Sequence, residues 1–178
     1  MEEASVIGVT SDKKIAKVTL LDVPDRPGVA AKIFLDLAAK DMNIGLIIQS
    51  SAAHHRAGIT FIIEEGLADA ATKLLAEWKR EGFAAEGTVD KGVATVSIIG
   101  SRLAATPGMA GRMFSALARQ GINVDCISSS EMTVSCVVAA AQIAQAVRAV
   151  HAEFFANQPA NVPAVTNAAG TAPAMSAP

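Results

Sequence analysis

The chain has 178 residues, 51% of them hydrophobic, which is enough to bury the core of one domain or of two small ones. Its formal net charge is -2, and its 15 Lys and Arg residues form no basic run, which argues against a nucleic-acid backbone as its partner. The opening Met1-Glu2-Glu3-Ala4 has no apolar signal segment, so we expect a cytoplasmic protein in which Cys126 and Cys136 form no disulfide.

The first half of the sequence indicates a strand followed by a βαββαβ unit, the element order of the ferredoxin-like fold. Alternation of apolar and polar residues indicates strands, and apolar residues spaced four apart indicate helices. The expected elements are strands at 5–10 and 15–21, a helix at 27–40, strands at 43–49 and 59–63, a helix at 67–81 and a strand at 83–89.

The same order begins again after Gly92, which indicates an internal repeat. Residues of the first half meet identical residues 80 positions later, as Pro27, Gly28 and Asn43 meet Pro107, Gly108 and Asn123. The second set comprises a strand at 94–99, a helix at 107–120, strands at 123–129 and 132–138, and a helix at 141–154.

The second unit has no fourth strand of its own, because residues 157–178 show no periodic pattern and are expected to be a disordered tail. An unpaired sheet edge and the unpaired strand near the N-terminus are both costly. We therefore predict an α+β fold of two interleaved ferredoxin-like units; a plain tandem arrangement is the alternative. The predicted domains are 14–90, then 91–156 completed by an N-terminal strand at 3–12.

No catalytic or metal constellation is apparent. The three histidines, His54, His55 and His151, lack metal-ligand spacing, and the glycine motifs of phosphate-binding loops are absent. RNA binding is disfavoured because the chain has no Tyr and only one Trp. We expect no enzyme activity, no metal and no cofactor.

The repeated Pro-Gly turn is the candidate binding element. Pro27 is expected at the first helical position, and Gly28 beside it lets a ligand approach the unpaired first-turn N–H groups. Such groups suit a carboxylate, while Asp25 can accept from an ammonium group and Gln49 can donate or accept. Asp25 as a simple helix cap is the alternative. Ala105 and Ser129 occupy the equivalent positions in the second unit, so two sites would differ.

These motifs resemble the paired ACT domains of aspartate kinase, including its separate regulatory β subunit. The resemblance covers Met1 to about Phe155, although Ser50-Ser51-Ala52 replaces the Asn-Val-Ser that often follows Gln49. The residues that carry it are Val23 to Phe34, Asn43-Ile44, Gln49, Pro107-Gly108, Gly121 to Val124 and Ile127 to Glu131.

The resemblance implies an amino-acid-sensing module that binds threonine, lysine or both as allosteric ligands and gives feedback control of aspartate-family amino-acid biosynthesis. It also implies a homodimer through the ACT domains and a catalytic kinase partner, an ATP:L-aspartate 4-phosphotransferase whose own domain is absent here. An ACT-domain sensor serving another enzyme or pathway is the alternative. One effector site would comprise Asp25, Gly28, Val29, Ala30 and Gln49 facing Asn123 and Val124, and a second would comprise Met109 and Ala110 facing Asn43 and Ile44.

Overall fold

The computed structural model describes residues 5–52 and 54–156. Every helix and strand expected from the sequence is present, and short 3-10 turns precede the second and fourth helices. The elements are β1 (Ser5–Asp12), β2 (Ile15–Pro24), α1 (Val29–Ala38), β3 (Ile47–Ala52), β4 (Arg56–Glu64), α2 (Ala68–Glu81), β5 (Glu86–Asp90), β6 (Val93–Ser101), α3 (Met109–Ala118), β7 (Cys126–Ser129), β8 (Thr133–Ala139) and α4 (Ile143–Phe155).

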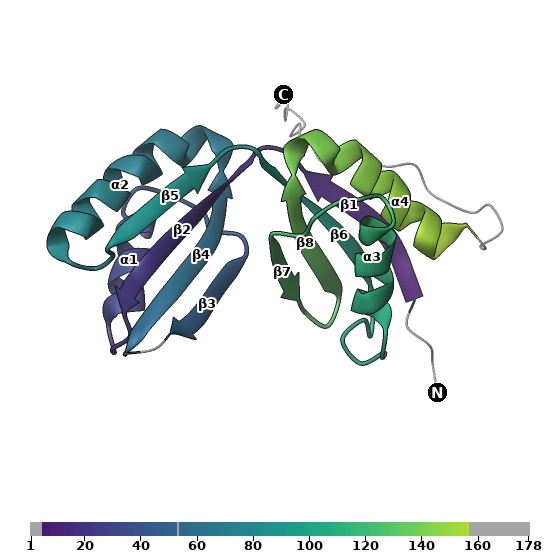
Figure 1. Cartoon of the computed structure of the whole chain (residues 1–178), viewed down its shortest axis with the longest axis horizontal. Coiled ribbons are helices and arrows are strands. Elements are labelled where there is room, and N and C mark those ends of the chain that lie inside the picture. The colour runs from purple at the N-terminus through teal and green to yellow at the C-terminus, as the bar shows by residue number, and fades with distance from the viewer. Residues whose placement is uncertain (1–4, 53, 157–178) are drawn as a thin grey trace, which may run out of the picture.

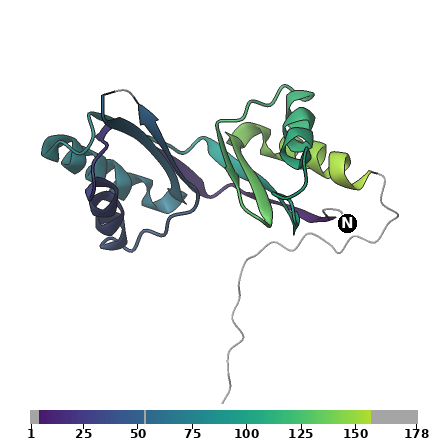
Figure 2. The ribbon, with the colours of Figure 1, turned by 90° about the horizontal axis from the view of Figure 1, so that it is seen from below.

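The strands form two antiparallel four-stranded sheets, ordered β3-β4-β2-β5 and β1-β6-β8-β7. The N-terminal strand β1 pairs with β6, from Ser5 opposite Ser101 to Asp12 opposite Thr95. The predicted interleaving is therefore confirmed: the purple N-terminal strand lies in the right-hand unit, beside β6 (Figures 1 and 2). We call β2 to β5 with α1 and α2 the first unit, and β1 with β6 to α4 the second unit. The predicted tail, 157–178, lies outside the described residues.

Each sheet is covered by its two helices on one face, where its core lies. In the first unit the largest fully buried side chains are Trp78 of α2 and Phe61 of β4. In the second unit Met113 and Leu117 of α3 pack with Val150 of α4. The alternate residues of the strands therefore form the opposite faces, which the helices leave uncovered.

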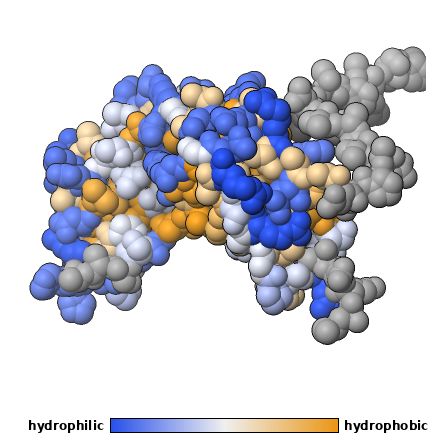
Figure 3. Space-filling model, turned by 45° about the vertical axis from the view of Figure 1, so that its right-hand side comes forward, coloured by the Kyte–Doolittle hydropathy of each residue, from blue (hydrophilic) through white to orange (hydrophobic). Residues whose placement is uncertain are grey.

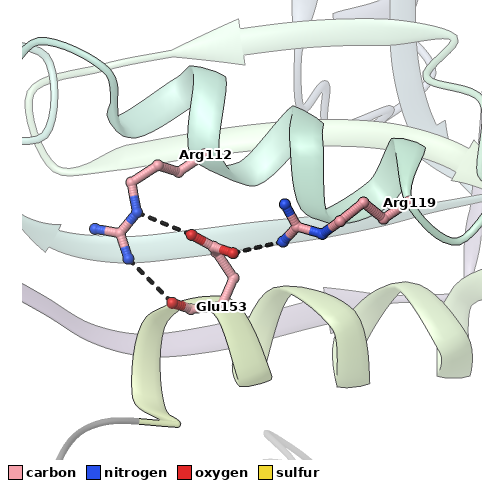
Figure 4. Close-up of polar contacts among 3 residues, drawn as sticks. All are labelled: Arg112, Arg119 and Glu153. Carbon is pink, nitrogen blue, oxygen red and sulfur yellow. Dashed lines mark hydrogen bonds and ion pairs between the residues drawn. The ribbon is translucent and has the colours of Figure 1, made fainter.

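Different polar contacts join the helices in the two units. In the first unit the Trp78 indole Nε1–H donates to Asp36 of α1 at 2.8 Å, and Lys32 donates to the same carboxylate at 2.5 Å. In the second unit Glu153 of α4 accepts from Arg112 at 3.0 Å and from Arg119 at 2.5 Å (Figure 4). These hydrogen bonds favour the charged carboxylates and hold the pKa of Asp36 and of Glu153 below its usual value.

Several predicted element ends were wrong. Helix α1 begins at Val29 because Gly28 takes a left-handed backbone, φ 93°, so Pro27 precedes the cap instead of opening the helix. The run predicted as a strand from residue 43 joins the sheet only from Gly45, whose N–H donates to Ile62, and Phe83 precedes β5. Cys126 and Cys136 are both free thiols, but only Cys136 is fully buried.

Candidate functional site

The two helix-start turns have matching geometry. Gly28 and Gly108 are the N-caps of α1 and α3, with φ 93° and 89°, and neither cap has a side-chain hydrogen bond. The Lys32 N–H donates to the Gly28 carbonyl at 2.9 Å, but the described residues offer no acceptor to the N–H groups of Ala30 and Ala31. Each turn therefore presents unpaired N–H groups at the positive end of a helix, which is a favourable place for an anion.

Asp25 directly follows β2 and precedes this turn, and Gln49 lies on β3, three residues before the end of that strand nearest the turn. Asp25 is exposed, and its backbone N–H donates to the His55 carbonyl at 2.8 Å. Because Gly28 is the cap, Asp25 does not act as the helix cap that was the alternative reading. Gln49 is exposed on the edge strand β3 and lies opposite Ile59, so it belongs to the face that α1 covers. Val29 is buried beneath the turn, and Ala30 is half-buried.

The other predicted site residues lie at the two ends of the helices: two of them begin α3, and the others follow the C-terminal end of α1 or α3. Asn123 and Val124 connect α3 to β7, while Met109 and Ala110 begin α3. A ten-residue helix separates these positions by about 15 Å. Asn43 and Ile44 occupy the equivalent connection in the first unit. Asp125, next to Val124, contacts Lys17 near the start of β2, whereas the Gly28 turn follows the other end of β2. Likewise Leu46, two residues after Ile44, packs near Val93 at the start of β6, whereas the Gly108 turn follows the other end of β6. Within one chain neither turn therefore meets the connecting segment predicted to face it.

A cavity of about 520 Å³ lies between the two units, and the sequence did not predict it. It combines aliphatic side chains with the hydroxyl groups of the second sheet's uncovered face, where the Ser97 and Ser135 Oγ atoms lie 2.7 Å apart. In Figure 3 hydrophobic side chains gather in the hollow in the middle of the molecule, between more hydrophilic outer surfaces. Of the predicted site residues, only Asn43 and Ile44 line it. The full lining is Asp12, Ile15, Asn43, Ile44, Gly45, Leu46, Ile62, Ile63, Glu64, Thr95, Ser97, Ser128 and Ser135.

The contact between the units contains a small apolar cluster and one ion pair. The cluster comprises Ile15, Ile62, Val93 and Val137, with Leu46 and Cys126 packed against them. Lys17 of β2 forms an ion pair with Asp125, the residue before β7. No other ion pair joins the two units within residues 5–52 and 54–156. Desolvation in this cluster raises the pKa of the Cys126 thiol.

The described residues contain neither a metal-binding cluster nor a helix that could span a membrane. No group of three or more His, Cys, Asp or Glu side chains in this part of the chain is arranged to hold a metal ion. None of the helices described is both long and apolar enough to span a membrane.

Comparison with known proteins gives the family. Residues 21–77 and 96–154 match the ACT domain family. An aspartate kinase of Pseudomonas fluorescens is 36% identical over 160 residues, which are 90% of this chain but 39% of that protein. The chain thus spans about two fifths of the curated relatives it matches.

Two solved structures match over nearly their whole length. The ligand-free regulatory subunit of aspartate kinase from Thermus thermophilus is 34% identical with a TM-score of 0.78, covering 84% of this chain and 99% of that one. A structure of aspartokinase alpha and beta subunits is 31% identical with a TM-score of 0.77 and the same two coverages. The chain therefore belongs to the ACT-domain regulatory regions of the aspartate kinase family.

Proposed function

We propose that this chain is the amino-acid-sensing module of an aspartate kinase, and that threonine, lysine or both bind between its ACT units to exert feedback control. The observation that carries the proposal is the repeated glycine-capped turn, because each copy presents unpaired helix N–H groups. The curated relatives and the solved regulatory subunits support the kinase as the regulated enzyme.

The chemistry of the first turn fits a free α-amino acid. The N–H groups of Ala30 and Ala31 suit the ligand carboxylate, and the exposed Asp25 carboxylate suits its ammonium group. Gln49 can donate to or accept from the ligand's side chain. The second turn has neither acid nor amide at the equivalent positions, Ala105 and Ser129, so its affinity or ligand preference would differ.

A second copy of the chain would complete both pockets. Within the described residues β3 and β7 are edge strands of their sheets, and the repeat-related Ile47 and Ile127 on them are 51% and 46% exposed. Antiparallel pairing of β3 with β7 of the second copy would bury both and join the sheets. It would also bring Asn123 and Val124 of that copy to the end of β3 where α1 begins. The mirrored pairing would bring Asn43 and Ile44 to Met109 and Ala110.

Regulation would follow from a shift in population. A ligand that binds between units favours one of their relative orientations, and it can move the attached kinase only by its difference in affinity for the two orientations. The solved structure of aspartokinase alpha and beta subunits supports a catalytic subunit as the partner.

Calorimetric titration with threonine and with lysine, alongside sizing by light scattering, tests the proposal. We expect saturable binding by a dimer, and Asp25→Ala or Gln49→Ala should weaken it roughly ten- to a hundredfold, because each removes a polar partner of the ligand. Glu86→Ala, an exposed acid on the opposite edge strand β5, is the matched control and should bind normally. Unchanged affinity in both pocket variants would refute the pocket. Binding without association with a kinase subunit would favour a sensor for another enzyme.

A further inference from the structure

The contact between the two units is built from repeat-related residues. Its apolar part consists of three pairs that occupy equivalent places in the two sheets, namely Ile15 with Val93, Ile62 with Val137, and Leu46 with Cys126. The hydrogen bonds agree, since the Gly45 N–H donates to the Ile62 carbonyl at 2.9 Å and the Asp125 N–H donates to the Val137 carbonyl at 2.8 Å. The apolar contact is thus nearly symmetric and does not distinguish one side from the other.

The ion pair breaks this symmetry. Lys17 lies opposite Ile62 in the first sheet, and the equivalent residue opposite Val137 in the second sheet is Thr95. Asp125 likewise corresponds to Gly45 in the first unit. One side of the contact therefore has a Lys–Asp pair whose side chains are 17% and 42% exposed, and the mirrored side has threonine and glycine. A partly shielded ion pair is worth more than a fully exposed one.

On each side of the contact, the residues involved directly follow in sequence a connecting segment that belongs to a proposed effector pocket. Asn123 and Val124 are followed by Asp125 of the ion pair and Cys126 of the apolar cluster. Asn43 and Ile44 are followed by Gly45, which carries no charge, and by Leu46 of the apolar cluster. Each segment therefore lies within two residues of the contact, but only the segment with Asn123 and Val124 leads to a charged residue there.

We propose that the Lys17–Asp125 ion pair is a one-sided latch that sets the relative orientation of the two ACT units and couples it to the pocket containing Asn123 and Val124. The pocket containing Asn43 and Ile44 is coupled more weakly, because its side of the contact lacks the latch. The coupling to a ligand rests on the proposed function, whereas the effect of the latch on orientation does not.

The first experiment is made without any amino acid. Small-angle X-ray scattering compares the wild-type protein with Lys17→Thr, which installs the residue of the mirrored side. We expect the variant to populate open orientations about fivefold more and so to show a larger radius of gyration. Arg119→Ala, which removes an ion pair inside the second unit, should scatter like the wild type. Identical scattering by Lys17→Thr and the wild type would overturn the latch.

Two double variants test whether the effect comes from the ion pair itself and not from a general disturbance of the fold. One exchanges the two charges, and the other places an equivalent pair on the mirrored side. Lys17→Asp combined with Asp125→Lys should restore the wild-type scattering that each single change disturbs. Thr95→Lys with Gly45→Asp should build a latch on the mirrored side and narrow the spread of orientations. A Cβ atom at Gly45 would lie 3.7 Å from the Ile62 Cβ, an ordinary contact, so the aspartate has room. A charge exchange that scatters like the single variants, although circular dichroism shows it folded, would contradict the proposal.

The second experiment adds the ligands. Calorimetry with threonine and lysine should show that Lys17→Thr changes the affinity of the site containing Asn123 and Val124 about fivefold and that of the other site by less. Two sites with wild-type affinities in this variant would overturn the coupling. Absence of binding to the wild-type protein would instead refute the proposed function, and the ligand-free scattering would still decide whether the latch exists.

Discussion

Replacement of Asp36 tests the hydrogen bond that links α1 to α2 in the first unit. The Asp36 carboxylate accepts from the indole N–H of Trp78, which is 1% exposed, and from Lys32, whose side chain is 44% exposed. Asp36→Ala leaves the indole N–H buried without an acceptor, at a cost of about 1–3 kcal/mol. Loss of the solvent-exposed ion pair with Lys32 adds only a small further destabilisation, because water screens the two charges. The better helix propensity of alanine offsets up to about 0.7 kcal/mol.

The net expectation for Asp36→Ala is a loss of about 2 kcal/mol in the free energy of unfolding, which lowers Tm by roughly 4–8 °C for a chain of this size. Urea unfolding followed by the fluorescence of Trp78, the single tryptophan, measures it directly, with circular dichroism as an independent probe. Lys32→Ala is the control, because it removes the ion pair and leaves the indole hydrogen bond in place. Equal losses in the two variants would refute the reasoning.

The same carboxylate makes stability depend on pH. Its pKa in the folded state is lowered, first by the hydrogen bond from Lys32 and then by that from Trp78. Its contribution is therefore present above the unfolded-state pKa of about 3.9 and is lost as pH falls through the lower folded-state value. Asp36→Asn should be less stable than the wild type at pH 7, and the difference should shrink between about pH 5 and pH 3. A constant difference over this range would contradict the expected linkage.

Two further predictions concern the turns and the thiols. Gly28→Ala and Gly108→Ala should each lower the free energy of unfolding, measured with urea, by about 1–2 kcal/mol. The cause is strain in the left-handed backbone alone, because an added Cβ meets no atom within 4 Å. A loss above about 3 kcal/mol would show instead that the turn is packed. Burial raises the pKa of the Cys136 thiol to about 12. At pH 8 a thiol reagent should therefore modify half-buried Cys126 first and reach Cys136 only on unfolding. Modification in the reverse order would contradict this.

The repeat is what made the fold predictable. Two copies of the same element order with one strand missing indicated that the N-terminal strand crosses to the second unit, and β1 does pair with β6. The ends of the elements were less predictable, because they depend on local hydrogen bonding. The apolar run that begins at Asn43 is typical of a strand, yet the edge strand gains its first hydrogen bond only at Gly45.

The candidate site was predictable only in part. The turn at Gly28 is a local feature, so its sequence indicates its geometry. The latch is not local, because Lys17 and Asp125 are 108 residues apart and meet only through the relative placement of the two units. The sequence indicates this ion pair only through the repeat. The residues equivalent to Lys17 and Asp125 are Thr95 and Gly45, so the two charges are present in one copy of the position and absent from the other.

The crossing of β1 into the second unit has a consequence for synthesis. The ribosome makes β1 before the four strands of the first unit, but its partner β6 follows all four of them. At about 5–20 residues per second, β1 remains unpaired for on the order of ten seconds while the first unit is being completed. During that time β1 can pair with β6 of a neighbouring nascent chain, which would yield dimers that exchange this strand. Crowded expression should therefore favour strand-exchanged dimers, whereas slow refolding of a dilute chain should not.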